Sequence, residues 1–261
     1  MSIIIAVANQ KGGVGKTTSA VTLAHGLACV GRRVLVVDLD PQGHVATALG
    51  LEKADGLYRL LVDGEPLKKV AQRARETTTG GRLDAVLGNK RTELAKLHLA
   101  AMNFRERVLA KALAGAPYDM VLLDCAPSSD VLHVAALVAA QWLLVPTRLD
   151  HLALDGVNEL VTSAAELRQG GYSTVTLAGV LPTFHERRTV ETGELLKQLC
   201  DSFGAQVWPV IPADVKAREA PSAGKTLWEY APKTAAVMGY PEGGMPSGYL
   251  AALKRMTAAC A

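Results

Sequence analysis

The amino-acid sequence predicts an α/β fold: a doubly wound, mostly parallel sheet with helices on both faces. Three observations predict it. Short apolar runs recur along the 261 residues, segments with helical periodicity separate them, and a glycine-rich loop follows the first run directly. The 49% hydrophobic content is ample for one large core, and no repeat or linker divides the chain. We therefore expect a single domain over residues 1–261.

Seven segments rich in β-branched residues are the expected strands. Most are apolar without alternation, as a parallel strand covered by helices on both faces requires. They are "SIIIAVAN", "RRVLVVDLD", "RLDAVLG", "YDMVLLDCAP", "QWLLVPTRL", "VTLAGVLP" and "AQVWPVIP".

Helices are expected between these strands. Residues 16–31 and 152–171 have helical periodicity and end in glycine, a common stop signal. Residues 51–82 are polar and charged, and we expect peripheral helices there. The alanine-rich tail, residues 248–261, is expected to pack on the domain. Ligands of such a fold bind at the carboxyl ends of the strands.

Composition narrows the function classes. A net charge of +3 and a pI near 8.6 exclude a surface built throughout to coat nucleic acid, so any DNA contact has to be local. The four cysteines form no C-x-x-C pair, which argues against a zinc site or a disulfide framework. The first apolar run has no preceding basic region, and no run approaches the roughly 20 apolar residues that span a bilayer. We expect a cytoplasmic protein that does not bind membranes.

The stretch "NQKGGVGKTT", residues 9–18, has the character of a phosphate-binding loop. Its end matches G-K-[ST], but Gln10 stands where the first glycine of the usual pattern belongs, and Lys11 adds a second lysine. Glycines let backbone N–H groups close on a phosphate, and the following helix points its positive end there. Lys16 should reach the β- and γ-phosphates, and Thr17 should ligate Mg²⁺. The expected nucleotide-binding residues are Lys11, Gly12, Gly13, Val14, Gly15, Lys16, Thr17 and Thr18.

Three aspartates end two of the predicted strands. Asp38 and Asp40 lie two residues apart, so on a strand they share one face at the phosphate end. Asp40 lies farther out and is better placed to orient an attacking water. Asp38 is expected to hold the water shell of the metal, or Lys16, although either aspartate could orient the water. Asp124 ends a Walker B pattern and is expected to hold Mg²⁺ through water.

These residues identify a family resemblance. From "NQKGGVGKTTSAVTLAHGLA" through "VLVVDLDPQGHVATALG" and "YDMVLLDCAPS" to "IPADVKAREAPSAGKTLWEYAP", the chain resembles the ParA/MinD group of deviant Walker A ATPases, which have the P-loop NTPase fold. Within the group it is similar to the short ParA type, which lacks a helix-turn-helix domain. Pro212, in the last segment, joins the expected nucleotide-binding residues.

The resemblance implies an ATPase that uses ATP and Mg²⁺. In the family, the lysine matched by Lys11 crosses to the ATP of the second subunit in a sandwich homodimer, which implies catalytic roles for Lys11 and Lys16 beside Asp40 and Asp38. A lysine supplied by the partner subunit couples charge at the γ-phosphate to dimerisation.

The family also binds DNA without sequence preference, as an ATP dimer on the nucleoid, and moves a plasmid, chromosome or protein cargo such as a carboxysome in the McdA manner. A ParB-like or cargo-adaptor partner stimulates hydrolysis. Residues 215–261 hold six Lys/Arg against three acidic residues, a modest basic excess. The expected DNA-binding residues are Arg187, Arg188, Lys216, Arg218 and Lys225.

Two other functions of this group are less favoured. A MinD-like, membrane-associated ATPase would end in a basic amphipathic helix, whereas the tail "GYLAALKRMTAACA" is short and alanine-rich, and "NQKGG" and "DPQG" favour ParA. A nitrogenase-type reductase needs two cluster-binding thiolates per subunit, and Cys125 has no second cysteine at a matching position.

Overall fold

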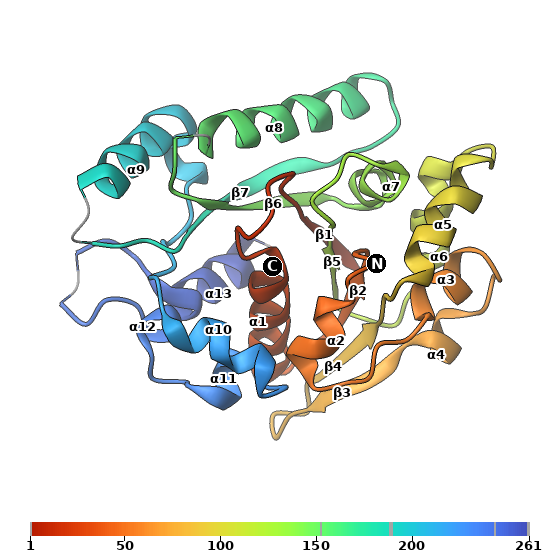
Figure 1. Ribbon diagram of the computed structural model, residues 1–261, viewed down its shortest axis with the longest axis horizontal. Coiled ribbons are helices and arrows are strands. Elements are labelled where there is room, and N and C mark those ends of the chain that lie inside the picture. Colours follow the sequence, from red (N-terminus) through yellow and green to blue (C-terminus); the bar gives the residue numbers. More distant parts are fainter. Residues whose placement is uncertain (1, 152, 188–189, 243, 260–261) are drawn as a thin grey trace.

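A seven-stranded sheet forms the centre of the computed structural model, which describes residues 2–151, 153–187, 190–242 and 244–259 (Figure 1). The strand order is β3-β4-β2-β5-β1-β6-β7, and only β3 runs antiparallel, against β4. The strands are β1 (Ile3–Val7), β2 (Arg33–Asp38), β3 (Gln72–Glu76), β4 (Arg82–Val86), β5 (Met120–Asp124), β6 (Trp142–Arg148) and β7 (Thr176–Thr183). The predicted fold class is confirmed.

Helices cover both faces, and each face has its own apolar core because successive strand residues point to opposite sides. In β1, Ile4 and Ala6 belong to one core, while Ile5 and Val7 belong to the other. The first core is covered by α3 (Gly56–Leu61), α4 (Leu67–Val70), α5 (Arg91–Ala100), α6 (Val108–Leu113), α7 (Val131–Ala139), α8 (Ala153–Gln169) and α9 (Val190–Phe203). The second is covered by α1 (Lys16–Cys29), α2 (His44–Leu49), α10 (Val215–Ser222), α11 (Leu227–Tyr230), α12 (Ala235–Met238) and α13 (Gly248–Ala259). Two short 3₁₀ turns are η1 (Arg105–Arg107) and η2 (Gly204–Gln206).

The tail packs on the domain, as its composition predicts. Helix α13 lies against α1 (Figure 1), where the Tyr249 hydroxyl is 2.9 Å from the Ser19 hydroxyl. Gly26 allows this contact, because a Cβ on it would lie 2.9 Å from a methyl of Leu253. In the part of the chain that the structure describes, no helix combines the length and apolar character that crossing a membrane requires.

Two predicted elements differ from the structure. The segment "AQVWPVIP", residues 205–212, is not a strand. It meets β7 and its continuation through the isolated bridges Val180–Val207 and His185–Pro212 and a few separate backbone hydrogen bonds, such as that from the Trp208 N–H to the Val180 carbonyl at 2.8 Å. Pro209 and Pro212 have no N–H to donate, so a continuous ladder cannot form. Within residues 51–82, α3 and α4 are the expected peripheral helices, but β3 is an edge strand. Its sequence, "QRARE", is charged and has no apolar alternation, as is common at an exposed sheet edge.

Candidate nucleotide-binding site

The glycine loop between β1 and α1 forms a cradle at the carboxyl end of the central strands. Gly13 and Gly15 have φ angles of 72° and 83°, which favour glycine. Two side chains fix the loop to neighbouring strands: Asn9 donates to the Pro146 carbonyl at 2.9 Å, and Thr183 donates to the Val14 carbonyl at 2.9 Å. The loop is thus held with its N–H groups at the start of α1, where an anion is favoured.

The side chain of Lys16 lies inside this cradle. Its ammonium donates to the Lys11 carbonyl at 2.8 Å, which closes the loop over it. Burial lowers the pKa of Lys16, and the nearby Asp124, Cys125 and Asp40 act in the opposite direction. Lys16 is therefore a partly desolvated cation surrounded by acidic groups, the environment in which a phosphate contact is strong.

Asp124 carries a buried carboxyl group. Its side chain is 1% exposed, and neither of its oxygens accepts a hydrogen bond from any described residue. Burial raises the pKa of Asp124 to about 7, against the lowering influence of the Thr17 hydroxyl and the Lys16 ammonium. An unpaired buried carboxylate is costly unless a cation compensates it. Asp124 and Thr17 therefore fit Mg²⁺, which prefers oxygen ligands and retains several waters.

Asp38 and Asp40 have different surroundings. Asp38 is fully buried, and its two oxygens accept backbone N–H groups of Asp40 at 3.0 Å and Val45 at 3.2 Å. Burial raises the pKa of Asp38 well above its usual range, with Asp124 adding to the effect. Asp40 is half-buried, accepts the Gln42 N–H at 2.8 Å and faces the cavity. Asp38 does not line the cavity; it shapes the turn that presents Asp40.

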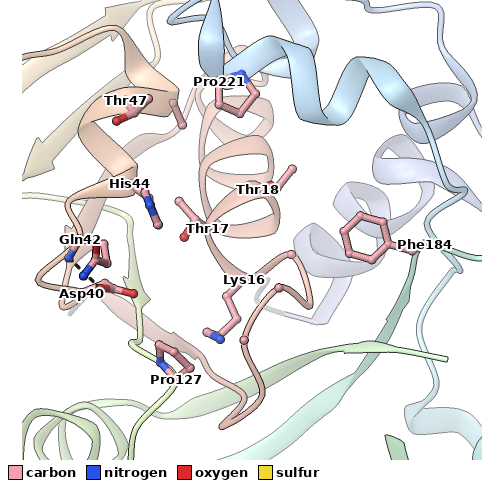
Figure 2. A pocket seen from close by; sticks show the side chains of 14 residues that line it. Lys16, Thr17, Thr18, Asp40, Gln42, His44, Thr47, Pro127, Phe184 and Pro221 are labelled. Atoms are coloured by element: carbon pink, nitrogen blue, oxygen red, sulfur yellow. Dashed lines mark hydrogen bonds between the residues drawn. The ribbon is translucent and has the colours of Figure 1, made fainter. Parts of the chain in front are cut away.

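A cavity of about 470 Å³ opens above the cradle, enough for a nucleotide. Figure 2 shows Lys16 and Thr17 at its centre, Asp40 and His44 on one side, and Phe184 on the other. The lining residues are Gly12, Gly13, Gly15, Lys16, Thr17, Thr18, Asp40, Gln42, His44, Thr47, Ala48, Pro127, Phe184 and Pro221. Most of the predicted phosphate loop is among them. Val14 is buried behind the loop, and Pro212 lies away from the cavity, beside His185.

Lys11 points away from this cavity. Its ammonium pairs with the Asp150 carboxylate at 2.5 Å, just beyond the end of β6, and its backbone N–H donates to the Asn9 side chain at 2.9 Å. The two side chains of the ion pair are 39% and 23% exposed, so water reaches the pair and weakens it. Lys11 is therefore held by a solvent-accessible ion pair within the chain.

Four of the predicted DNA-binding residues, Arg187, Lys216, Arg218 and Lys225, belong to the part of the chain that the structure describes. Arg187 pairs with Glu242 at 3.1 Å, and Lys216 pairs with Glu219 at 2.7 Å. Arg218 and Lys225 are exposed and form no ion pair with any residue that the structure describes. Backbone hydrogen bonds join His185 to Ile211 and Ala213. The residues that follow β7 therefore lie beside the residues that lead into α10. Arg188 lies outside the described residues.

Several site residues were not predicted. Asp150 follows β6, and Phe184 follows β7, so both come directly after strand ends, where ligands of such sheets bind. That position is the signal that could have found them. His44, Thr47 and Pro221 come from α2 and α10, and only the packing of those two helices brings them to the cavity.

Known proteins resemble this chain in sequence over most of its length. The family model described as an AAA domain matches residues 2–176. The chain is 40% identical to the chromosome-partitioning ATPase Soj of Thermus thermophilus, over 90% of this chain and 91% of Soj. It is 37% identical to the chromosome partitioning protein ParA of Caulobacter vibrioides, over 91% of this chain and 90% of that protein.

Solved structures share the fold. Apo McdA of Cyanothece superposes with a TM-score of 0.83 at 20% identity, covering 100% of both chains. Cobyrinic acid a,c-diamide synthase of Mycobacterium smegmatis, with bound ADP and magnesium, superposes with a TM-score of 0.75 at 32% identity, covering 86% of this chain and 92% of that one.

Proposed function

The chain belongs to the ParA family of P-loop ATPases, and we propose that it forms an ATP-bound dimer, binds DNA without sequence preference and uses partner-stimulated hydrolysis to position a cargo. One observation carries the proposal. Lys16, Thr17, Asp124 and Asp40 converge on a glycine cradle at the carboxyl ends of β1, β2 and β5, an arrangement suited to phosphoryl transfer. The family resemblance seen in the sequence is confirmed by Soj and ParA.

We propose ATP and Mg²⁺ as the cofactors. Backbone N–H groups of residues 12–17 bind the phosphates, and Lys16 exchanges its bond to the Lys11 carbonyl for a phosphate oxygen. Thr17, and Asp124 through water, would hold the metal, which when bound would supply positive charge at the phosphates. The oxygens of Asp124, which accept no hydrogen bond from the described residues, would then gain a partner.

Asp40 orients the attacking water. Its carboxylate lies at the cavity wall with Lys16 nearby, and its bond to the Gln42 N–H fixes its direction. Asp38 supports that role indirectly, since its bond to the Asp40 N–H sets the backbone of the turn. A positioned carboxylate beside a bound phosphate is the arrangement that general-base or water-orienting catalysis requires.

Dimerisation is proposed to turn Lys11 toward the partner subunit. The Lys11–Asp150 pair then breaks, and the ammonium is available to stabilise the negative charge that develops on the partner's ATP. Two copies of the modest basic face around Arg218 and Lys225 together form a DNA-binding surface. If the protein binds DNA in this way, its location is the cytoplasm, on the nucleoid.

A MinD-like membrane role is the alternative, and no specific feature favours it. The tail helix α13 uses its apolar residues against α1, with Leu253 and Met256 buried. Arg255 donates to the Val207 carbonyl at 2.8 Å and stacks over Trp208. These side chains are already used in packing the domain.

Phosphate release from ATP tests the proposed activity. The parent protein should hydrolyse ATP in the presence of Mg²⁺, and Lys16→Ala should lose both ATP binding and hydrolysis. Lys197→Ala, at an exposed position of α9, is the matched control and should behave like the parent. Equal turnover in the parent and Lys16→Ala would show that the cradle is not the site of hydrolysis.

A further inference from the structure

Four large apolar side chains are exposed on α5 and the turn that follows it. Leu94, Leu97, Met102 and Phe104 are 46%, 69%, 44% and 74% exposed, and we call them the α5 surface. Six other large apolar side chains are exposed among the described residues, and no other stretch of eleven residues contains more than two of them. Figure 1 shows α5 at the outer edge of the molecule, beside α6. Exposed apolar side chains gathered in this way mark interaction sites.

Helix α5 packs on the fold through a different face. Helix α5 buries Thr92, Ala95 and Leu99 against its neighbours, and these three define its inner face. Leu94 and Leu97 are three residues apart and lie on the opposite face. Met102 and Phe104 continue the apolar stretch just beyond the end of the helix.

Phe104 is held in a strained backbone conformation. Its φ of 55° and ψ of 30° lie in the left-handed region, which costs a bulky residue energy and favours glycine or asparagine. Among the described non-glycine residues, only Phe184 shares a positive φ, and Phe184 lines the nucleotide cavity. Strain of this kind persists mainly where a side chain serves a function. On an exposed turn, that function is a contact made by the ring.

The surroundings of the α5 surface are positively charged. Residues 89–111 contain six basic and two acidic side chains. Arg91 pairs with Asp55 and Lys96 with Asp130. The remaining four basic side chains are exposed and form no ion pair with the described residues: Lys90, Arg105, Arg107 and Lys111.

We propose that the α5 surface is a docking site for an acidic amphipathic segment of a partner protein. Apolar side chains of the segment, at helical spacing, contact the four apolar side chains of the α5 surface. Carboxylates on the flanks of the segment lie near the four exposed basic side chains that form no ion pair with the described residues. An anionic membrane fits less well. Only Leu94 and Leu97 of α5 are exposed apolar anchors, which is a narrow apolar face for a helix that inserts into a lipid surface.

The position of the α5 surface connects it to the nucleotide site. On the inner side of α5, Lys96 pairs with Asp130 at 2.8 Å. Asp130 caps α7 through the Leu132 N–H at 2.9 Å and accepts a bond from the Ser128 hydroxyl at 2.9 Å. These contacts fix the loop between Asp124 and α7. The Lys96–Asp130 ion pair therefore connects α5, on which the segment docks, with the loop that follows Asp124, the proposed metal ligand.

A helical peptide of about fifteen residues tests the proposal, with Leu and Phe at i, i+3, i+4 and i+7 spacing and Glu elsewhere. Its binding to the full chain is followed by fluorescence anisotropy without nucleotide, so the result does not depend on ATPase function. The test variant is Phe104→Gly, which removes the ring and relieves the strained backbone. Tyr172→Ala, an exposed aromatic outside the α5 surface, is the matched control.

The proposal predicts saturable binding that weakens at least about tenfold in Phe104→Gly and is unchanged in Tyr172→Ala, with no loss of thermal stability in Phe104→Gly. A peptide with Lys in place of Glu should bind much more weakly. The proposal is overturned by equal binding to Phe104→Gly, by equal binding of the Lys peptide, or by no saturable binding up to about 1 mM. It is also overturned if Phe104→Gly abolishes binding to phosphatidylglycerol vesicles, or self-association of the chain, while the peptide does not bind.

Discussion

At the residue scale, Asp38 and Asp40 are two identical side chains on one turn with different surroundings, which suit the different roles that we propose for them. Asp38 is buried and accepts two backbone N–H groups, whereas Asp40 is half-buried and faces the cavity. The sequence places both at the end of β2 but leaves open which of them meets solvent. Only the turn at residues 38–45, which folds back on Asp38, distinguishes them.

Replacing each aspartate should therefore have a different effect. Asp38→Asn puts an amide N–H against a backbone N–H and should lower the free energy of unfolding by about 1–3 kcal/mol. Asp40→Ala should leave stability and ATP binding close to the parent values and abolish hydrolysis. Chemical denaturation and phosphate release measure the two effects. A stable Asp38→Asn variant, or an active Asp40→Ala variant, would reverse the assignment.

Asp150 is expected to restrain Lys11 in the monomer. Asp150→Asn removes the charge that pairs with the ammonium, so ATP-dependent dimerisation should occur at a several-fold lower protein concentration. The effect is limited because exposed pairs contribute at most about 1 kcal/mol. Unchanged dimerisation in Asp150→Asn, measured by sedimentation, would show that the pair does not restrain Lys11.

Lys11→Ala should bind ATP normally but lose hydrolysis, since its charge acts on the partner's ATP.

At the scale of elements, the approach of α2 to the end of α10 shapes one wall of the cavity. Gly50 and Gly224 both have positive φ, and a Cβ on Gly50 would lie 2.7 Å from the Gly224 carbonyl oxygen. The same two helices contribute Thr47 and Pro221 to the cavity. The nucleotide site thus depends on a backbone contact between segments far apart in the chain.

Gly50→Ala should consequently lower both stability and ATP affinity. Its methyl meets a backbone atom that cannot move aside easily, so we expect the free energy of unfolding to fall by about 2 kcal/mol or more. Gly64→Ala is the matched control: Gly64 has a φ of 69° but no atom within 4 Å of a Cβ, so only the left-handed strain of about 1 kcal/mol applies. Equal decreases of stability in the two variants would mean that the contact between Gly50 and Gly224 has room for a methyl group.

The sequence predicts the elements whose residues carry a periodic apolar signal. Six of the seven expected strands and helices α1, α8 and α13 are present, because burial on both faces of the sheet imposes that signal. The edge strand β3 was not predicted, because its residues are charged rather than apolar. Charged side chains on an edge strand hinder its pairing with another chain. The phosphate loop is local in sequence and was predicted. The Lys11–Asp150 pair was not, because it requires knowing that β1 and β6 are neighbours.

At the scale of the whole molecule, the proposed DNA surface is small in one subunit. Lys216 and Arg187 already form ion pairs, which leaves Arg218 and Lys225 as the unpaired cations of that group among the described residues. Appreciable affinity for DNA therefore needs two subunits.

DNA binding should require ATP and weaken strongly with salt. The double variant Arg218→Ala with Lys225→Ala should flatten the slope of log affinity against log salt, by about 0.9 for every DNA phosphate that is no longer neutralised. Lys69→Ala, on α4 at the opposite face of the sheet, should leave the slope unchanged. Filter binding of plasmid-length DNA at several salt concentrations measures this, and equal affinity with ATP, ADP and no nucleotide would exclude the two-subunit surface.

The central claim, that ATP joins two subunits through this site, is tested most directly by the mass of Asp40→Ala in solution. Sedimentation velocity with Mg²⁺ should give twice the monomer mass of 27.5 kDa with ATP and the monomer mass with ADP. Adding Lys16→Ala to this variant should abolish the dimer. A monomer in every nucleotide state, or a dimer that forms equally well with ADP, would contradict the account.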